Sequence, residues 1–294
     1  MKISGFTFIR NAIKYDYPIV EAIRSILPIC DEMVVAVGNS EDETRNLIQS
    51  IGGTKIKIID TIWDDNMREN GKVLAVETNK ALAAISPDSS WCFYIQGDEV
   101  LEDHQLDYIH EAMKHFEKDE KVDGFLFDYL HFYGSYDYIG ASNSWYKNEI
   151  RIIRNRLGIY SYKDAQGFRK DENKKLSVVK LDAKIHHYGW VKDPRSMQQK
   201  QENFNKYWHD DQWMTKNIIR TDEFSYEDHM TEIRKFEGNH PQVMSERINR
   251  LNWKFNRDLT MQKKKWKDKF KDILLKFGID ASYQNYRLYK RFQK

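Results

Sequence analysis

The sequence predicts an α/β fold whose mainly parallel sheet is flanked by helices, on the basis of three observations. Apolar strand-like runs alternate with helix-like periodicities through the first 128 residues. The run at 91–95, Trp-Cys-Phe-Tyr-Ile, has the length and aromatic content of a buried strand. It leads within three residues to the adjacent carboxylates Asp98 and Glu99, at the end of the strand where open α/β sheets bind ligands.

The alternating segments follow one another in the order that parallel strand–helix–strand units require. Asp16 and Pro18 mark the first helix, Asn39 and Ser40 precede the second, and Ser86 follows the third. Right-handed crossovers place the carboxyl ends of all these strands on one edge, so the regions of Asn39, Gln96 and Asp98 are expected to lie together. Strands are expected at 3–9, 32–37, 55–59, 91–95 and 122–127, and helices at 18–27, 41–51, 73–85 and 102–117.

The second half of the chain has a different character. Residues 128–190 are rich in aromatic residues and glycine, with short strand-like pieces at 149–153 and 176–181. Asp193-Pro194 and His240-Pro241 each signal a helix start. Since no Gly/Ser-rich or Pro-rich linker separates the parts, we predict one α/β domain over 1–190 and a helical extension over 191–294 packed on it.

Composition limits the cellular setting. The chain has 294 residues, 40% of them hydrophobic, and a net charge of +2. Its two cysteines, Cys30 and Cys92, both lie in apolar segments, which favours buried thiols in a reducing compartment. The N-terminus does not read as a signal peptide, and no stretch of about 18 uncharged apolar residues occurs. We therefore expect a cytoplasmic protein.

The C-terminal segment 261–294 is strongly basic, with eleven Lys or Arg and three Asp. Five of its apolar residues, Trp266, Phe270, Ile273, Leu274 and Phe277, fall on one helical face, and Tyr283, Tyr286, Tyr289 and Phe292 follow at intervals of three. Three interpretations stay open: a helix on an anionic membrane surface, a nucleic-acid contact, or a solvated helix packed on the domain. Because no common nucleic-acid module is present, we expect no nucleic-acid partner, and a peripheral contact with the inner face of the membrane is the functional alternative to simple packing.

The acids after residue 95 suggest a specific chemistry. A carboxylate at the rim of a sheet suits a hard divalent cation, and such a cation suits a diphosphate. Asp98 is the candidate ligand, Gln96 is placed to bond a nucleotide ribose, and Trp145 and Tyr146 are candidates for stacking on a sugar. The alternative for each is an ordinary structural role, in a solvated turn for the polar residues and in the core for the aromatic ones.

Several short motifs occur in an order that resembles the GT-A fold of family-two-like glycosyltransferases of the bacterial surface-glycan type. The similarity covers roughly residues 1–130 and continues weakly to 190. The motifs are Arg10-Asn11 after the first strand, Gly38-Asn39-Ser40-Glu41-Asp42-Glu43-Thr44 after the second, Trp63-Asp64, Asn70-Gly71-Lys72, Thr78-Asn79-Lys80-Ala81-Leu82, and Gln96-Gly97-Asp98-Glu99. The resemblance implies donor binding by the residues Arg10, Asn39, Asp64, Lys72, Gln96 and Asp98.

The same resemblance implies a cofactor, a stereochemistry and a set of catalytic residues. Mn²⁺ or Mg²⁺ would be held by Asp98 and His187, the latter within His186-His187-Tyr188-Gly189-Trp190. An inverting transfer needs a carboxylate base, for which Asp164 and Glu149 are the candidates, with Asp128 as a further possibility. Trp145 and Arg151 are the expected acceptor contacts.

Two positions depart from the family pattern. The usual aspartate-any-aspartate motif reads Gln96-Gly97-Asp98, so its first carboxylate is missing, and Gly38 stands where an aspartate usually reads the base.

The predicted function is transfer of a sugar from a nucleotide-sugar donor to a glycan or lipid-linked acceptor, in polysaccharide biosynthesis. The alternatives are a non-catalytic nucleotide- or glycan-binding protein, which the two departures favour, and a sugar-phosphate nucleotidyltransferase. The latter is disfavoured because no Gly-rich loop with basic residues follows the first strand.

Overall fold

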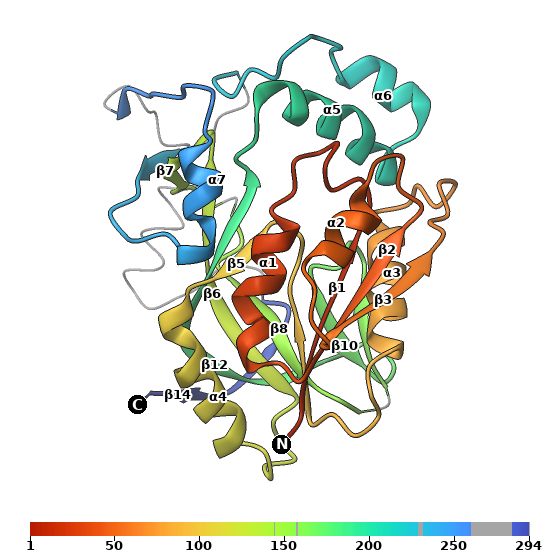
Figure 1. The fold of residues 1–294 in the computed structure, drawn as a ribbon, viewed down its shortest axis with the longest axis vertical. Coiled ribbons are helices and arrows are strands. Elements are labelled where there is room, and N and C mark those ends of the chain that lie inside the picture. Colours follow the sequence, from red (N-terminus) through yellow and green to blue (C-terminus); the bar gives the residue numbers. More distant parts are fainter. Residues whose placement is uncertain (144, 157, 229–231, 260–283, 294) are drawn as a thin grey trace.

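A computed structural model describes residues 1–143, 145–156, 158–228, 232–259 and 284–293. Its centre is an eleven-stranded mixed sheet in the order β13-β7-β6-β8-β4-β1-β2-β3, with β12 beside β6 and both β5 and β14 beside β12 (Figure 1). The first half contributes the elements β1 (Ile3–Ile9), α1 (Ile19–Ile26), β2 (Glu32–Gly38), α2 (Thr44–Ser50), β3 (Ile56–Thr61), α3 (Lys72–Ala83), β4 (Trp91–Tyr94), β5 (Glu99–Leu101) and α4 (Leu106–His115).

The strands β3, β2, β1 and β4 are all parallel, as the alternation of strands and helices predicts. β8 then runs antiparallel to both β4 and β6, and β6 pairs with β12 in parallel. The predicted fold class, an α/β sheet flanked by helices, is confirmed, and the second half adds antiparallel strands to the parallel set. That half contributes β6 (Gly124–Tyr133), β7 (Ser135–Gly140), β8 (Asn148–Arg154), β9 (Ile159–Tyr162), β10 (Gly167–Lys170), β11 (Lys174–Lys175) and β12 (Ser177–Trp190).

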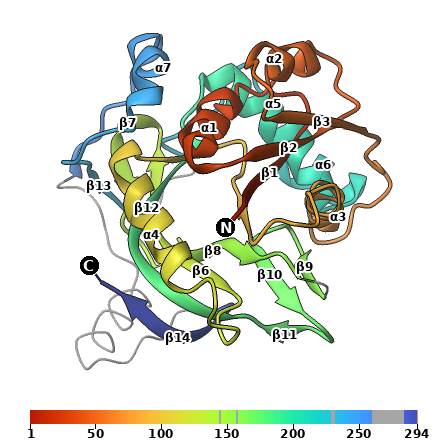
Figure 2. The ribbon, with the colours of Figure 1, turned by 60° about the horizontal axis from the view of Figure 1, so that its bottom comes forward.

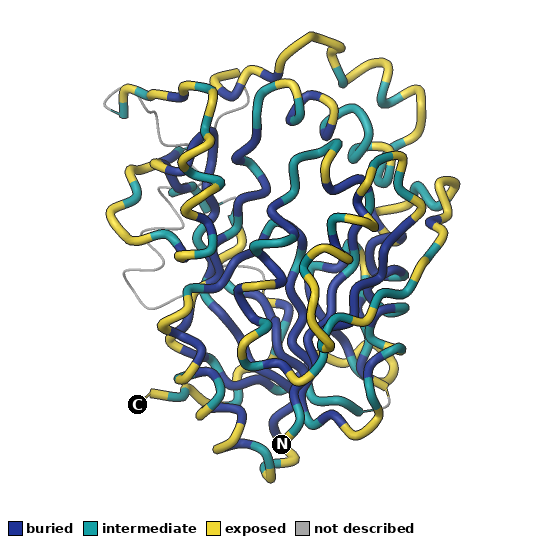
Figure 3. The backbone as a smooth tube through the Cα atoms, viewed as in Figure 1, coloured by how far each residue is buried: buried dark blue, intermediate teal, exposed yellow. Residues whose placement is uncertain are grey.

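The central strands are buried (Figure 3). Their side chains alternate between two cores, one on each face of the sheet. In β4, Trp91 and Phe93 join the core covered by α1, α2 and α4, whereas Cys92 and Tyr94 join the core covered by α3 and the small β9–β11 sheet (Figure 2). This explains why β4 reads as a continuous apolar run rather than as an alternation.

The C-terminal part begins at Asp193, whose carboxylate accepts a hydrogen bond from the backbone N–H of Arg195 at 2.9 Å and so caps the next helix. In Figure 1 this helix lies at the top, with the N-terminus of the chain at the bottom. The elements of this part are α5 (Pro194–Phe204), the 3₁₀ turn η3 (Asn205–Tyr207), α6 (Asp211–Asn217), β13 (Ile233–Lys235), the 3₁₀ turn η4 (Gln242–Met244), α7 (Ser245–Asn249) and β14 (Arg287–Phe292).

The last of these elements differs from the expectation. Residues 287–292, which a spacing of three placed in a helical tail, form β14, and this strand pairs in parallel with β12. Tyr289 and Phe292 pack against the main core. Sheet pairing with a distant strand outweighs the local periodicity here. Most of the basic stretch, 261–283, lies outside the described residues, so the membrane contact stays a prediction. No helix in the described part of the chain is long and apolar enough to cross a membrane.

Candidate functional site

A cavity of about 510 Å³ opens at the carboxyl ends of β1 and β4. Its walls also come from the loop after β9, from His187 on β12, and from the α5–η3 segment. Seven candidate site residues from the sequence line it: Arg10, Gln96, Asp98, Tyr146, Arg151, Asp164 and His187. Strands far apart in sequence therefore bring these side chains to one edge of the sheet, where ligands of open α/β sheets bind.

The turn after β4 separates its two acids. Glu99 is buried and its carboxylate accepts two hydrogen bonds from the Arg151 guanidinium, at 2.7 and 2.8 Å, and one from the Tyr129 hydroxyl at 2.9 Å. Removing one partner of such a buried pair would leave an uncompensated charge, so replacing either residue alone is expected to destabilise the fold. Arg151, expected at the acceptor, thus has its guanidinium engaged by Glu99, while Asp98 is left to face the cavity.

Asp98 is held by its backbone and surrounded by basic groups. Its carbonyl accepts a hydrogen bond from the Tyr188 N–H at 2.8 Å, which fixes the turn to β12. Its Oδ1 lies 3.8 Å from His187 Nε2, and its Oδ2 lies 3.7 Å from Lys200 Nζ. Burial alone would raise the pKa of Asp98, but His187, Lys200 and Lys192 outweigh it and lower that pKa. The carboxylate is therefore ionised at neutral pH.

Two buried lysines beside Asp98 are functional candidates that the sequence did not reveal. Lys200 Nζ donates to the carbonyl of Gly189 at 2.9 Å, and Lys192 Nζ donates to the carbonyl of Asp16 at 2.8 Å. Burial, followed by the charge of Lys200, lowers the pKa of Lys192 to about 7. In sequence, Lys200 is one polar residue of a polar helix, and only the tertiary fold turns it toward the sheet.

Trp63 explains the glycine that follows β2. A Cβ atom at Gly38 would lie 2.4 Å from Trp63 Nε1, so the indole occupies the space that a side chain at 38 would need. Asn39 holds this arrangement through two hydrogen bonds. Its side-chain Oδ1 accepts from the backbone N–H of Trp63 at 3.1 Å, and its backbone carbonyl accepts from Arg10 Nε at 3.2 Å. The Arg10 guanidinium lies 5.7 Å from the centre of the Trp63 ring, and the Tyr207 ring packs on Trp63 with ring centroids 5.6 Å apart. Arg10, Trp63 and Tyr207 form an aromatic and cationic end of the cavity.

The loop that carries Asp164 is strained. Lys163 and Ala165, on either side of it, have φ angles of 54° and 61°, and Ala165 is fully buried. The Ala165 carbonyl accepts from Gln96 Nε2 at 3.2 Å, which ties this loop to the end of β4. One oxygen of Asp164 has no hydrogen-bond partner among the described residues, and burial raises the pKa of its carboxyl.

Glu149 lies behind this loop and does not line the cavity. Its Oε2 also has no hydrogen-bond partner in the described part of the chain. Burial raises its pKa to about 8, with Glu99 and Asp164 adding to the rise and Arg151 and Arg169 opposing it. At neutral pH Glu149 is therefore mostly protonated inside the folded protein.

This raised pKa predicts a pH-dependent stability. The native state keeps the Glu149 proton while the unfolded state releases it above its ordinary pKa of 4.5, so the free energy of unfolding falls as pH rises from 4.5 toward 8. We expect Glu149→Gln to stabilise the protein by about 4 kcal/mol at pH 8 and by less than about 1 kcal/mol at pH 5. Urea unfolding at both pH values measures this, and an equal effect at the two values would contradict it.

Among the other predicted residues, Asn39, Asp64, Lys72 and Trp145 do not line the cavity. Asp64 is exposed, and its Oδ1 accepts from the Asn66 N–H at 2.9 Å. Lys72 is exposed at the first turn of α3. Trp145 stacks on His131, with ring centroids 4.9 Å apart and planes at 24°.

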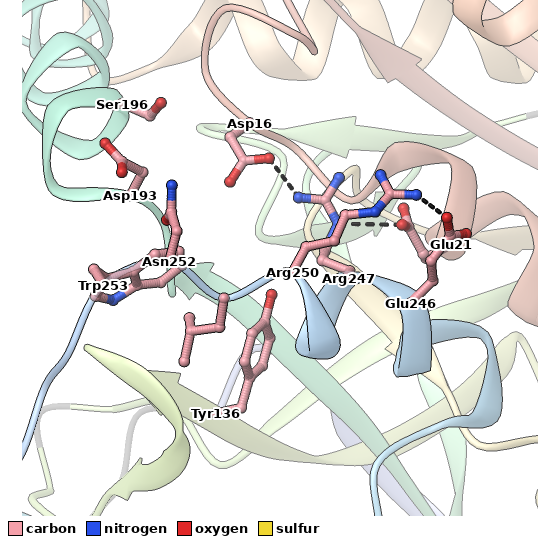
Figure 4. Close-up of a pocket in the computed structure, with 11 residues that line it drawn as sticks. Asp16, Glu21, Tyr136, Asp193, Ser196, Glu246, Arg247, Arg250, Asn252 and Trp253 are labelled. Atoms are coloured by element: carbon pink, nitrogen blue, oxygen red, sulfur yellow. Dashed lines mark hydrogen bonds and ion pairs between the residues drawn. The ribbon is translucent and has the colours of Figure 1, made fainter.

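A second cavity of about 300 Å³ lies beside the N-terminal end of α5. Figure 4 shows that both of its arginines are paired with acids: Arg247 pairs with Asp16 and Glu21, and Arg250 pairs with Glu246. None of the candidate site residues from the sequence lines this second cavity, so the larger cavity is the better candidate for the ligand site.

No protein-family model matches this sequence, and no curated protein does. Solved structures that match at low identity include TarS from S. aureus (14% identity, TM-score 0.41) and glucosyl-3-phosphoglycerate synthase from Mycobacterium tuberculosis in complex with Mn²⁺, UDP and phosphoglyceric acid (18%, 0.31). These two alignments cover 69% and 44% of this chain, and the chain spans only 38% and 43% of the two proteins. A third match is the 4-diphosphocytidyl-2C-methyl-D-erythritol synthase of Anaerococcus prevotii (12%, 0.33), aligned over 53% of this chain and 71% of that one.

Proposed function

We propose that this protein is a glycosyltransferase that uses a nucleotide-sugar donor. The observation that carries the proposal is the larger cavity, in which an ionised carboxylate, Asp98, lies next to buried lysines while a second carboxylate, Asp164, lines the same space. A diphosphate leaving group needs positive charge, and an attacking hydroxyl needs a base. Both requirements are met within one cavity at the carboxyl edge of parallel strands.

A divalent cation fits between Asp98 and His187. The Oδ1–Nε2 distance of 3.8 Å is too long for a hydrogen bond, yet it brings a carboxylate oxygen and an imidazole nitrogen to face one space. No group of three or more His, Cys, Asp or Glu side chains is close enough to hold an ion within the described residues, so phosphate and water oxygens would complete the coordination. When bound, Mn²⁺ or Mg²⁺ would neutralise charge on the leaving diphosphate.

The protein's own groups would perform three tasks. The Lys200 ammonium would bind phosphate oxygens beside Asp98, and the aromatic and cationic end formed by Arg10, Trp63 and Tyr207 would hold the nucleoside. Gln96, already bonded to Ala165, would contact the ribose while keeping the Asp164 loop in place. Asp164 would accept the proton of the acceptor hydroxyl during an inverting transfer to a glycan or a lipid-linked acceptor.

Two assays on the purified full-length protein test the proposal. A thermal-shift panel of UDP-, GDP- and CMP-sugars with and without Mn²⁺ should give a marked rise in melting temperature for one donor class. The same donor should then be hydrolysed slowly in the absence of acceptor. Tight binding with no hydrolysis or transfer would favour a non-catalytic binding protein, and no binding of any donor would refute the proposal.

Replacing Lys200 tests separately whether its ammonium binds the diphosphate. We expect Lys200→Met to weaken nucleoside-diphosphate binding about tenfold to a hundredfold, because it removes a desolvated ammonium while the Met side chain still packs on Tyr17 and Phe204. Isothermal titration calorimetry measures the change. Lys216→Met, an exposed lysine on α6, is the matched control, and equal affinity in the two variants would exclude Lys200 from the site.

A further inference from the structure

His131 contacts His187 on the side away from Asp98. The two imidazoles approach through their Nδ1 atoms, which are 3.0 Å apart, and His131 Nε2 lies 2.7 Å from the carbonyl oxygen of Tyr146. These contacts form a chain from a backbone carbonyl through two imidazoles to the cavity. We propose that His131 is a positioning residue, which fixes the His187 tautomer so that an unprotonated Nε2 faces Asp98.

The direction of the hydrogen bonds follows from the carbonyl at the far end. A carbonyl oxygen only accepts, so His131 Nε2 must carry a proton. A neutral imidazole with a proton on Nε2 has a lone pair on Nδ1, which must accept from His187. His187 therefore carries its proton on Nδ1, and its Nε2 has a free lone pair.

The consequence for the cavity is specific. The lone pair of His187 Nε2 and the Asp98 carboxylate oxygen face one another across 3.8 Å, and both are electron-pair donors. That arrangement attracts a cation and cannot form a direct hydrogen bond. With the proton on Nε2 instead, His187 would present a donor to Asp98 and could not bind a metal. The part of this inference that concerns metal affinity rests on the proposed function, whereas the tautomer does not.

The surroundings hold His131 firmly in this role. His131 on β6 and His187 on β12 are direct partners in the register of two parallel strands. The His131 ring is stacked between Tyr129, at 5.6 Å and 29°, and Trp145, at 4.9 Å and 24°. His131 is 4% exposed, so water does not compete for its nitrogens. Trp145, which was expected to contact the acceptor, therefore packs against the His131 ring.

Histidine NMR of the protein without metal tests the tautomer directly. Long-range ¹H–¹⁵N spectra of ¹⁵N-histidine-labelled protein should show His187, assigned with His187→Gln, protonated on Nδ1 and bare at Nε2. In His131→Phe, which keeps the ring stacking but removes the acceptor, the His187 signals should move toward the Nε2-protonated form. His131→Asn offers a carbonyl acceptor again and should restore the Nδ1-protonated form at least in part. An Nε2-protonated His187 in the wild type, or spectra unchanged by His131→Phe, would overturn the proposal.

Manganese binding in the presence of UDP or GDP provides the second readout, followed by electron paramagnetic resonance. We expect His131→Phe to weaken Mn²⁺ binding about tenfold to a hundredfold, and His131→Asn to recover part of the loss. An altered tautomer with unchanged Mn²⁺ affinity would refute the positioning role. Failure of the wild type to bind Mn²⁺ with any nucleoside diphosphate would instead count against the metal in the proposed function, and the NMR result would still decide the tautomer. Melting curves of both variants establish that they fold.

Discussion

Asp98→Asn is expected to reduce the affinity for a nucleoside diphosphate with Mn²⁺ by about a hundredfold to a thousandfold, and to reduce donor turnover by at least as much. The amide matches the carboxylate in size but carries no charge. It would be a poor ligand for a hard cation, and it would leave Lys200 without the carboxylate that lies beside it. Isothermal titration of UDP and GDP, with and without Mn²⁺, measures the loss.

A loss of binding in Asp98→Asn could also arise from a disturbed fold, and the position of Asp98 allows this explanation to be tested. Its backbone carbonyl, not its side chain, bonds to Tyr188, so the substitution keeps the contact that fixes the turn. Asp182→Asn, an exposed acid on the same strand as His187, is the matched control for the loss of one negative charge. If Asp98→Asn and Asp182→Asn bind the nucleotide and Mn²⁺ equally well, Asp98 has no part in holding the diphosphate.

The same titrations separate the contribution of the metal to diphosphate affinity from the contribution of the protein's own cations. In the wild type without Mn²⁺, any remaining diphosphate affinity would come from cations of the protein, chiefly Lys200 and Arg10. Lys200→Met should remove most of that remainder, whereas Asp98→Asn should mainly remove the part that depends on Mn²⁺. If the losses of binding free energy add in the double variant Lys200→Met, Asp98→Asn, the two groups act independently on the ligand.

The fold was predictable from sequence where local patterns and burial agree. β1, β2 and β4 are continuous apolar runs, and they occur within one or two residues of their predicted positions because strands buried on both faces leave no room for polar side chains. Parallel connectivity then placed Arg10, Gln96 and Asp98 at one edge. The sequence thus predicted the edge of the sheet on which the cavity lies, although it did not predict all the residues around it.

The unpredicted residues are those whose role depends on a partner far away in the chain. Lys200 becomes part of the cavity only when α5 brings its ammonium to the Gly189 carbonyl and to Asp98. Arg151, expected to contact the acceptor, turns out to pair with Glu99. His131 is a single histidine in an aromatic strand until β12 brings His187 beside it. β14 was missed for the same reason, because its pairing with β12 is a long-range contact. Spacing along the chain carries no information about such pairs.

Asp164→Asn should reduce transfer to an acceptor by about a thousandfold while leaving donor binding within a few-fold of the wild-type value. The carboxylate is proposed to act only when the acceptor hydroxyl loses its proton, so its removal should lower kcat rather than raise the donor KM. Steady-state kinetics with the donor identified by the thermal-shift panel, together with titration of that donor, measures the two quantities separately. Asp171→Asn, an exposed acid in the turn after β10, is the matched control.

The pH profile distinguishes Asp164 from its neighbour Glu149. A general base must be ionised, and burial raises the pKa of Asp164, so kcat/KM should fall as pH drops through this raised pKa. If Glu149, with a pKa raised to about 8, were the base instead, kcat/KM would begin to fall near pH 8. Glu149→Gln would then abolish the activity. Glu149 lies behind the cavity wall, whereas Asp164 lines the cavity between two strained residues and has a free carboxylate oxygen. Geometry therefore favours Asp164, and full activity of Asp164→Asn together with an inactive Glu149→Gln would reverse the assignment.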